Sequence, residues 1–172
     1  TRFGLPNYDT KDRYMLDGIL LEEKTRKGNE ITYKPLKETS FSRIKRFMSD
    51  NHWEVTDKSG TKRIYANTSE SCTGSGNKVF TWNLTKIEDV NNNTVIFEYD
   101  TFDEQNGKSY NYVYPTAIYY TGDKNKKGKY RVEFHYDEND IQRKDVRIDA
   151  RSKQIVACKK LLTSITTHYG ED

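Results

Sequence analysis

A strand–turn–strand pattern that occurs twice most constrains what this chain can fold into. The first copy covers residues 53–65 and turns at Asp57 and Gly60. The second covers residues 82–99 and turns after Asp89, at three consecutive asparagines. An Asp side chain accepts hydrogen bonds from a turn backbone, and Gly or Asn tolerates the positive φ that tight turns need. Aromatic and β-branched runs around such a turn predict a β-hairpin.

Weaker strand signals recur through the rest of the chain at intervals of roughly ten residues. Strict alternation of apolar and charged residues makes 130–136 the clearest strand, and it places Tyr130, Val132, Phe134 and Tyr136 on one face. Other expected strands cover residues 14–16, 19–22, 31–33, 40–44, 116–121 and 163–169, with an Asp17-Gly18 turn between the first two. Turns or loops are expected at 25–29, 67–77, 100–109 and 122–128.

Two segments fit a helix as well as a strand. The apolar residues of 41–48 have helical spacing, but the alternation within 40–44 favours a strand. Apolar residues of 153–165 could line one short helix, whereas the β-branched run 163–169 indicates a final strand. The sequence therefore predicts a mostly β fold: an antiparallel sheet of hairpins in a meander, with at most one short helix.

Composition favours a thin core rather than disorder. Hydrophobic residues make up 33% and charged residues 32% of the chain, yet it contains 13 Tyr and 7 Phe. Tyr buries a large ring while its hydroxyl stays hydrated, so sheets rich in Tyr can be ordered and wet on both faces. The net charge of +3 from 29 basic and 26 acidic residues gives no global attraction to nucleic acid or to an anionic membrane. No apolar run is long enough to predict a membrane span.

The length of the chain suggests a single domain, and its two cysteines are interpreted separately. Residues 1–172 are expected to form one β-rich domain, and the start at Thr1 without Met suggests a fragment of a much larger chain. Cys72 lies in the polar 67–77 loop, so its thiol is expected to be accessible. A disulfide with the distant Cys158 is not favoured.

No residue pattern indicates catalysis, a cofactor or a metal. The three histidines lack the spacing of metal ligands: His52 is expected in a loop, His135 is expected on the surface, and His168 is the third. The acidic stretch 137–140 is interpreted as a solvated turn without the spacing of a calcium loop. Asp57 and Asp89 are better explained as turn residues than as catalytic carboxylates. The chain is therefore expected not to be an enzyme and to need no cofactor.

The alternating Tyr110, Tyr112 and Tyr114 are the candidate ligand-contacting residues. Such rows can stack on sugar rings or on bases. Cross-strand packing within the sheet explains them equally simply and is the favoured reading.

An ordered series of motifs along nearly the whole chain resembles a known family. Segments around Tyr14, Ile44, Trp53, Trp82 and Tyr130 look like the domain named after the Salmonella virulence plasmid B protein. The same domain opens the B component of insecticidal toxin complexes and is related to Rhs and YD-repeat proteins. The residues interpreted as its structural motif, turns included, are Tyr14, Leu16, Asp17, Gly18, Trp53, Val55, Asp57, Gly60, Tyr65, Trp82, Leu84, Ile87, Asp89, Tyr99, Tyr130, Val132, Phe134 and Tyr136. Ala66 departs from the family, which commonly has Gly there.

The resemblance implies a non-catalytic structural module, a strip of an Rhs-like β-shell that encloses or presents a toxin polypeptide. Its partners would be neighbouring β segments of the parent chain or other toxin-complex subunits, and the fragment would tend to self-associate through unpaired strand edges. It would be secreted or associated with the bacterial cell surface. The alternative is a secreted carbohydrate-binding or adhesion module that uses the exposed Tyr rows.

Overall fold

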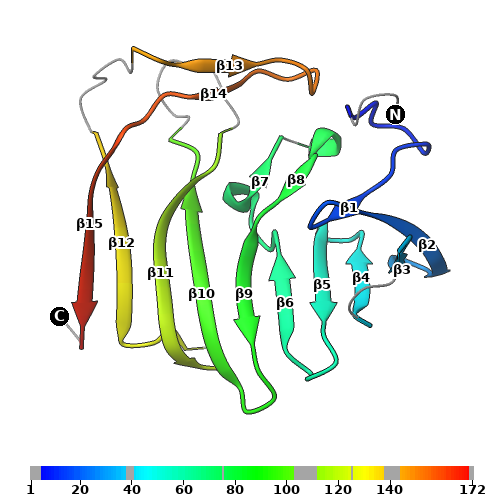
Figure 1. Ribbon diagram of the computed structural model, residues 1–172, viewed down its shortest axis with the longest axis horizontal. Coiled ribbons are helices and arrows are strands. Elements are labelled where there is room, and N and C mark those ends of the chain that lie inside the picture. The colour runs from blue at the N-terminus through cyan, green and yellow to red at the C-terminus, as the bar shows by residue number, and fades with distance from the viewer. Residues whose placement is uncertain are drawn as a thin grey trace.

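The main element of the structure is one large antiparallel sheet. The computed structural model describes residues 5–37, 41–74, 76–102, 112–124, 126–137 and 144–170. Eleven strands form the sheet, and they lie side by side in the order in which the chain makes them (Figure 1). They are β1 (Met15–Leu16), β2 (Ile19–Lys27), β3 (Glu30–Pro35), β4 (Arg43–Phe47), β5 (His52–Thr56), β6 (Lys62–Tyr65), β9 (Leu84–Glu88), β10 (Asn93–Asp100), β11 (Tyr114–Asp123), β12 (Tyr130–Tyr136) and β15 (Leu162–Tyr169). This confirms the predicted mostly β meander.

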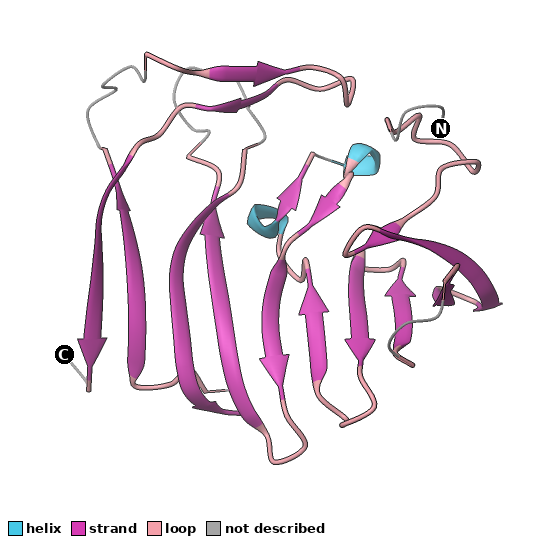
Figure 2. Ribbon diagram, viewed as in Figure 1, coloured by secondary structure: helices cyan, strands magenta, loops and turns pink. Residues whose placement is uncertain are grey.

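Two short hairpins interrupt the meander without entering the sheet. β7 (Cys72–Thr73) pairs with β8 (Thr81–Trp82) between β6 and β9, and β13 (Arg147–Asp149) pairs with β14 (Val156–Cys158) between β12 and β15. The only helical elements among the described residues are two 3₁₀ turns, η1 (Ser69–Ser71) and η2 (Gly76–Lys78), as Figure 2 shows. The short helix considered for 153–165 does not form, because this segment supplies β14 and the start of β15.

Both predicted hairpins are present, with one correction. β5 and β6 pair Trp53 with Tyr65, as the first pattern predicts. In the second hairpin β9 pairs with β10, but Trp82 is outside it and pairs with Cys72 in the β7–β8 hairpin. Asn83 causes the break, since its N–H donates to Ser71 O (2.9 Å) and its carbonyl accepts from Ala66 N–H (2.9 Å). The backbone at Asn83 is therefore hydrogen-bonded within the segment 66–83, here called the β7–β8 excursion, rather than to β10.

The limits of β2 and β4 differ from the prediction. β2 continues to Lys27, so the turn expected at 25–29 is confined to Gly28 and Asn29. The strand expected at 40–44 is β4 instead, and Phe41 lies outside it, exposed and with φ of +48°. Tertiary pairing with β3 and β5 decides these limits, because residues that pair on both sides become strand regardless of local propensity.

Connections of different length gather at opposite ends of the strands. The short turns after β5, β9 and β11 lie at the lower end in Figure 1, whereas β7–β8 and β13–β14 lie at the upper end. Antiparallel order produces this separation, because alternate connections leave the sheet at the same end. The segments after Phe102 and Asp137 lie outside the described residues, as do most of the loop expected at 100–109 and Tyr110.

The main buried cluster of the structure lies in the N-terminal half of the sheet. Its members are Leu21, Ile31, Tyr33, Ile44, Trp53 and Val55, with Tyr14, Leu16, Tyr65 and Trp82 packed against them. In the later strands the apolar side chains are mostly half-buried. A thin core of this kind is what the low apolar content predicts.

Candidate functional site

The Asp-led turns have the geometry expected of structural rather than catalytic carboxylates. Asp89 Oδ1 accepts from the backbone N–H of Asn91 (2.8 Å) and Asn93 (2.9 Å), and its Oδ2 accepts from Asn93 Nδ2 (2.8 Å). Asp57 Oδ1 accepts from Ser59 N–H at 2.9 Å. Hydrogen bonds from the side chains of Asn93 and Ser59, respectively, lower the pKa of Asp89 and Asp57. Both oxygens of Asp89 are therefore committed to its own turn.

The Asp17-Gly18 turn joins β1 to β2 with only two residues between the paired Leu16 and Ile19. Asp17 has φ of +49° and Gly18 has φ of +81°. Positive φ at both central positions is the type I′ geometry that matches strand twist in tight hairpins. This turn directs Tyr14 and Leu16 back onto the core.

Four aromatic rings from distant parts of the chain form one cluster on the sheet. Tyr14 lies 4.9 Å from Trp53 and 5.7 Å from Trp82 between ring centroids, and both contacts are edge-to-face. Tyr33 completes the cluster at 5.1 Å from Trp53. Edge-to-face aromatic pairs each contribute about 0.5–1.5 kcal/mol beyond simple burial. The cluster thus joins the Tyr14 segment, β3, β5 and β8, and the role of Trp82 is to connect the β7–β8 excursion to the core.

Arg46 lies inside this cluster, which the sequence patterns do not indicate. Its guanidinium carbon is 4.6 Å from the Tyr14 ring centroid and 5.4 Å from those of Trp53 and Trp82. It donates to Tyr14 Oη and to Asn51 Oδ1, and no ion pair joins it to a carboxylate in the described part of the chain. Its charge is therefore stabilised by aromatic faces. Alternation with Ile44 along β4 places Arg46 on the buried face, although a charged residue on a strand ordinarily indicates a solvated position.

The C-terminal strands carry an apolar row on one face. Val132 is opposite Ile118 and Thr167, and Phe134 is opposite Ile165. At the lower end, Tyr130 lies 5.3 Å from Tyr120 and 4.8 Å from Tyr169 between ring centroids.

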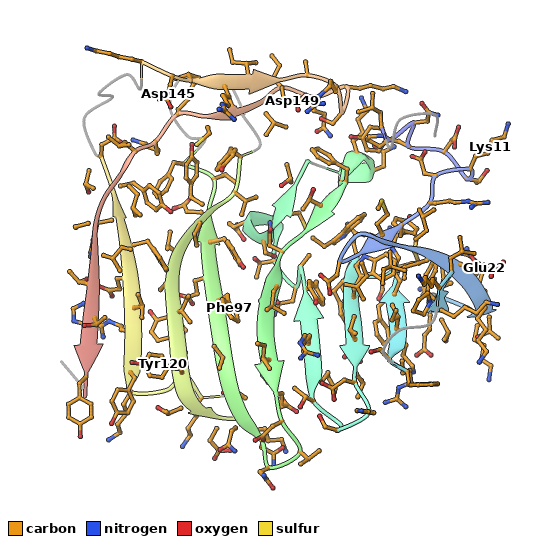
Figure 3. All side chains as sticks on the ribbon, in the orientation of Figure 1. Lys11, Glu22, Phe97, Tyr120, Asp145 and Asp149 are labelled. Atoms are coloured by element: carbon orange, nitrogen blue, oxygen red, sulfur yellow. The ribbon has the colours of Figure 1, made fainter. Side chains whose placement is uncertain are left out.

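Figure 3 shows Tyr120 near that lower end and Phe97 within the sheet, whereas Lys11, Glu22, Asp145 and Asp149 lie at the periphery. The apolar row of the C-terminal strands therefore forms a continuous surface that crosses the strands, half-buried on β12 and exposed on β15.

The candidate ligand-contacting tyrosines differ from one another. Tyr114 is only 4% exposed, and its ring packs against Phe102, Tyr112 and Tyr136. Its hydroxyl accepts the backbone N–H of Lys159 (2.7 Å) and of Lys160 (3.0 Å), and burial raises its pKa to about 12. Tyr114 therefore has no open ring face for a ligand. Tyr112 is 36% exposed.

Phe102, Tyr112, Tyr114 and Tyr136 form a second aromatic cluster. An open hollow of about 410 Å³ lies beside it. Phe102, Phe134 and Tyr136 line it together with His135, Asp137 and Lys160. Of the acidic stretch 137–140 the structure describes only Asp137, which is buried rather than solvated, and its Oδ1 accepts the N–H of Leu161 at 2.7 Å. Lys160 Nζ donates to the carbonyl of Asp137 at 2.9 Å, so both charged groups hold the start of β15 against β12.

The histidines take structural contacts. His52 begins β5 instead of lying in a loop, and its ring stacks on Phe47 with centroids 4.5 Å apart. His135 Nε2 and His168 Nε2 lie 2.7 and 3.2 Å from Thr166 Oγ1, and His168 Nε2 is 2.8 Å from Glu133 Oε2. In the described ranges, no group of three or more His, Cys, Asp and Glu side chains has the geometry to hold a metal ion.

Cys72 is buried, which corrects the expectation of an accessible thiol. Its backbone belongs to β7, its Sγ lies 3.7 Å from Thr68 O, and burial raises its pKa to about 11. Cys158 is not bonded to it. The β7–β8 pairing and the aromatic cluster around Trp82 cover this segment, which sequence composition alone could not show.

Ala66 adopts the backbone conformation for which glycine is favoured. Its φ is +56°, it is 2% exposed, and its N–H donates to Asn83 O. An L-residue with a side chain is strained in this region. Although the family commonly has Gly at this position, Ala66 keeps the turn, and its hydrogen bond to Asn83 closes the β7–β8 excursion.

The family model for the Salmonella virulence plasmid 65kDa B protein matches residues 1–171 of the chain. A comparison with curated protein sequences finds no match. No helix in the described ranges is long and apolar enough to cross a membrane.

Solved structures share the fold at low sequence identity. The N-terminal domain of effector protein SpvB from Salmonella typhimurium strain LT2 superposes with a TM-score of 0.79 at 13% identity, over 96% of this chain and 72% of that chain. TcdB2-TccC3-TEV gives a TM-score of 0.83 at 13% identity, over 97% of this chain. The Photorhabdus luminescens Tc holotoxin pore gives 0.81 at 13% identity, also over 97%. The chain spans 11% and 10% of the latter two chains.

Proposed function

The chain belongs to the Salmonella virulence plasmid 65kDa B protein family, and from this membership we propose that it is a non-catalytic structural module of a bacterial toxin-complex or Rhs-like β-shell. The module contributes sheet surface to a wall that encloses or presents a toxin polypeptide. Residues 1–172 act as one β-rich unit of a larger parent chain. Its partners are neighbouring β segments of that chain or other toxin-complex subunits, and it is secreted or associated with the bacterial cell surface.

The observation that carries this proposal is the eleven-stranded meander, whose main buried cluster lies at its N-terminal end. β1 to β6 bury a compact cluster, whereas the apolar side chains of β9, β10 and β12 are mostly half-buried. A sheet of this kind reaches full burial only against further structure, because half-buried apolar surface gains stability when it is covered. The same fold within the much longer TcdB2-TccC3 chains supports a role as part of a larger wall.

The arrangement of polar groups also favours a structural role. Asp57 and Asp89 are engaged in turn hydrogen bonds, and Asp137 and Lys160 hold strand ends. A general acid or base must reach a substrate proton, which these engaged groups do not offer. The proposal therefore assigns no reaction to the module.

The structure of the full-length parent protein tests the proposal. We expect the module to be one section of a continuous β-wall around an internal space, with its half-buried apolar row covered or facing that space. A parent in which the module stands apart as an isolated domain, with solvent on both faces, would refute the wall function.

The alternative, a carbohydrate-binding or adhesion module, receives little support from the tyrosine row. Tyr114 is packed on both sides, and of the described members only Tyr112 is partly exposed. A glycan array separates the two functions. A wall module should bind no glycan above background, and reproducible binding lost in Tyr112→Ala would favour the alternative.

A further inference from the structure

The last strand of the sheet has an unpaired side. β15 pairs with β12 along one side, and none of the described strands pairs along the other (Figure 1). A bulge at Thr163 separates its first residue from a regular stretch over 164–169. An unpaired strand presents a row of backbone donors and acceptors that can extend the sheet.

The two edges of the sheet differ in whether they carry features that hinder the addition of another strand. At the N-terminal end, β1 covers the start of β2, and the rest of β2 carries five charged residues within Glu22–Lys27. Charged side chains and short edge strands are the usual defences against strand addition. β15 has neither defence: the segment Leu162–Tyr169 contains no Asp, Glu, Lys or Arg, in a chain that is 32% charged.

Apolar side chains on β15 are exposed as well. Leu162 is 42%, Ile165 is 55% and Tyr169 is 79% exposed. Ile165 and Tyr169 lie on the same face, which also carries Thr167 between them and continues the apolar row of β12. The edge thus offers both free backbone groups and an uncovered pair of large side chains.

We propose that a second copy of this chain pairs with β15 through its own β15, antiparallel, to join the two sheets across a two-fold axis. A strand that lacks charge is complementary to itself, because no like charges oppose each other in the antiparallel pairing. The charged outer side of β2 cannot offer this to β15, which makes the β15 edges the matching pair.

The side chains select one register. Around a two-fold axis perpendicular to the sheet, residues opposite each other must lie on the same face, so the axis passes through one residue of the strand. With the axis at Thr167, Ile165 of each copy packs against Tyr169 of the other, and Thr166 is opposite His168. A register centred on Ile165 or on Thr166 brings the bulged Thr163 into the ladder and takes Tyr169 away from Ile165 of the other copy. Pairing of aromatic with β-branched residues therefore favours the Thr167 register.

This pairing concerns the 172-residue chain by itself and does not depend on the proposed wall function. A parent protein that supplies another strand to β15 would occupy the same edge, and the wall function would stand. Failure of the β15 pairing and failure of the wall function can be observed separately, because the pairing is measured on this chain and the wall function on the parent protein.

Sedimentation analysis of the chain from micromolar to millimolar concentration tests the association. We expect a monomer–dimer equilibrium that Thr167→Lys weakens at least about tenfold, because it places two lysines directly opposite each other on the axis, with Cα atoms roughly 5 Å apart, and like charges in opposed positions destabilise strand pairing. The matched control is Thr25→Lys, the same substitution at an exposed position of the opposite edge strand β2, which should leave the equilibrium unchanged. Circular dichroism and thermal unfolding show whether each variant keeps the wild-type fold.

A cross-linking experiment tests the register. Directly opposed strand residues lie within the Cα–Cα range of a disulfide, about 4.4–6.8 Å. Thr167→Cys should therefore form a covalent dimer under mild oxidation, whereas Thr166→Cys, about 8 Å from its counterpart in this register, should not, and the wild-type chain measures the background from its own cysteines. A strictly monomeric wild-type chain, a dimer weakened by Thr25→Lys instead, or cross-linking through Thr166→Cys alone would overturn the proposal.

Discussion

Replacement of Trp53 by alanine should remove the largest single contribution to the core. Trp53 is 6% exposed and contacts Tyr14, Tyr33, Trp82 and Arg46. A buried aromatic side chain removes about 200 Å² from water, which at about 25 cal/mol per Å² gives an upper estimate of about 5 kcal/mol. Truncations of this kind usually cost about 3–5 kcal/mol. We therefore expect Trp53→Ala to lower the free energy of unfolding by about 4 kcal/mol.

Urea unfolding followed by far-UV circular dichroism measures this loss. The wild-type fluorescence of Trp53 and Trp82 reports on the cluster itself, and in the variant only Trp82 remains. Ile148→Ala is the control, because Ile148 is 68% exposed and its truncation should change stability by less than about 0.5 kcal/mol. A loss below about 1.5 kcal/mol for Trp53→Ala, with an unchanged dependence on urea, would refute the assignment of this cluster as the centre of the core.

Three further outcomes follow from particular residues. Asp89→Ala should lower the thermal midpoint at pH 7, and the difference from wild type should shrink below about pH 4. The depressed pKa of Asp89 means that its carboxylate stabilises the fold at neutral pH, and protonation at low pH removes that stabilisation in the wild type as well. A constant difference down to pH 2 would contradict this. Gly128→Ala should severely impair folding, because its Cβ would clash with the carbonyl oxygen of Tyr120. Gly76→Ala meets nothing within 4 Å and should cost only about 1 kcal/mol of backbone strain. Equal thermal midpoints for the two variants would argue against the tight β11–β12 connection. Cys72 should resist a thiol reagent at pH 8 in the folded protein and react fully in denaturant. The reason is that burial both covers the thiol and raises its pKa to about 11. Rapid labelling without denaturant would show that the β7–β8 excursion opens.

Local patterns were sufficient to predict most strands of the large sheet and its tight Asp-led turns, but not the two side hairpins. The hairpin around Asp57 follows from residues that are close in sequence, and β12 was predicted with its observed limits because its alternation is unbroken. The same reasoning placed Trp82 in a hairpin strand. Its true partner, Cys72, is set by the path of the β7–β8 excursion, which depends on contacts that local periodicity does not contain.

The interior of the candidate site could not be predicted for a related reason. Arg46 lies among aromatic rings only because the registers of β3, β4 and β5 bring Tyr33 and Trp53 next to it, with Tyr14 folded over the top. Charge on a strand is ordinarily a sign of a solvated face, and only neighbours distant in sequence reverse that reading. Burial of Asp137 has the same origin, since its partner Leu161 begins after a long excursion.

The serial arrangement of the strands has a consequence for how the molecule can be made. Each strand from β1 to β6 adds beside the one synthesised immediately before it, and later strands do so after at most one side hairpin. Closing short loops costs little entropy, so every new length of polypeptide can anneal to an existing edge as it emerges, without waiting for a distant segment. Such a protein is suited to vectorial folding, from its first residue towards its last.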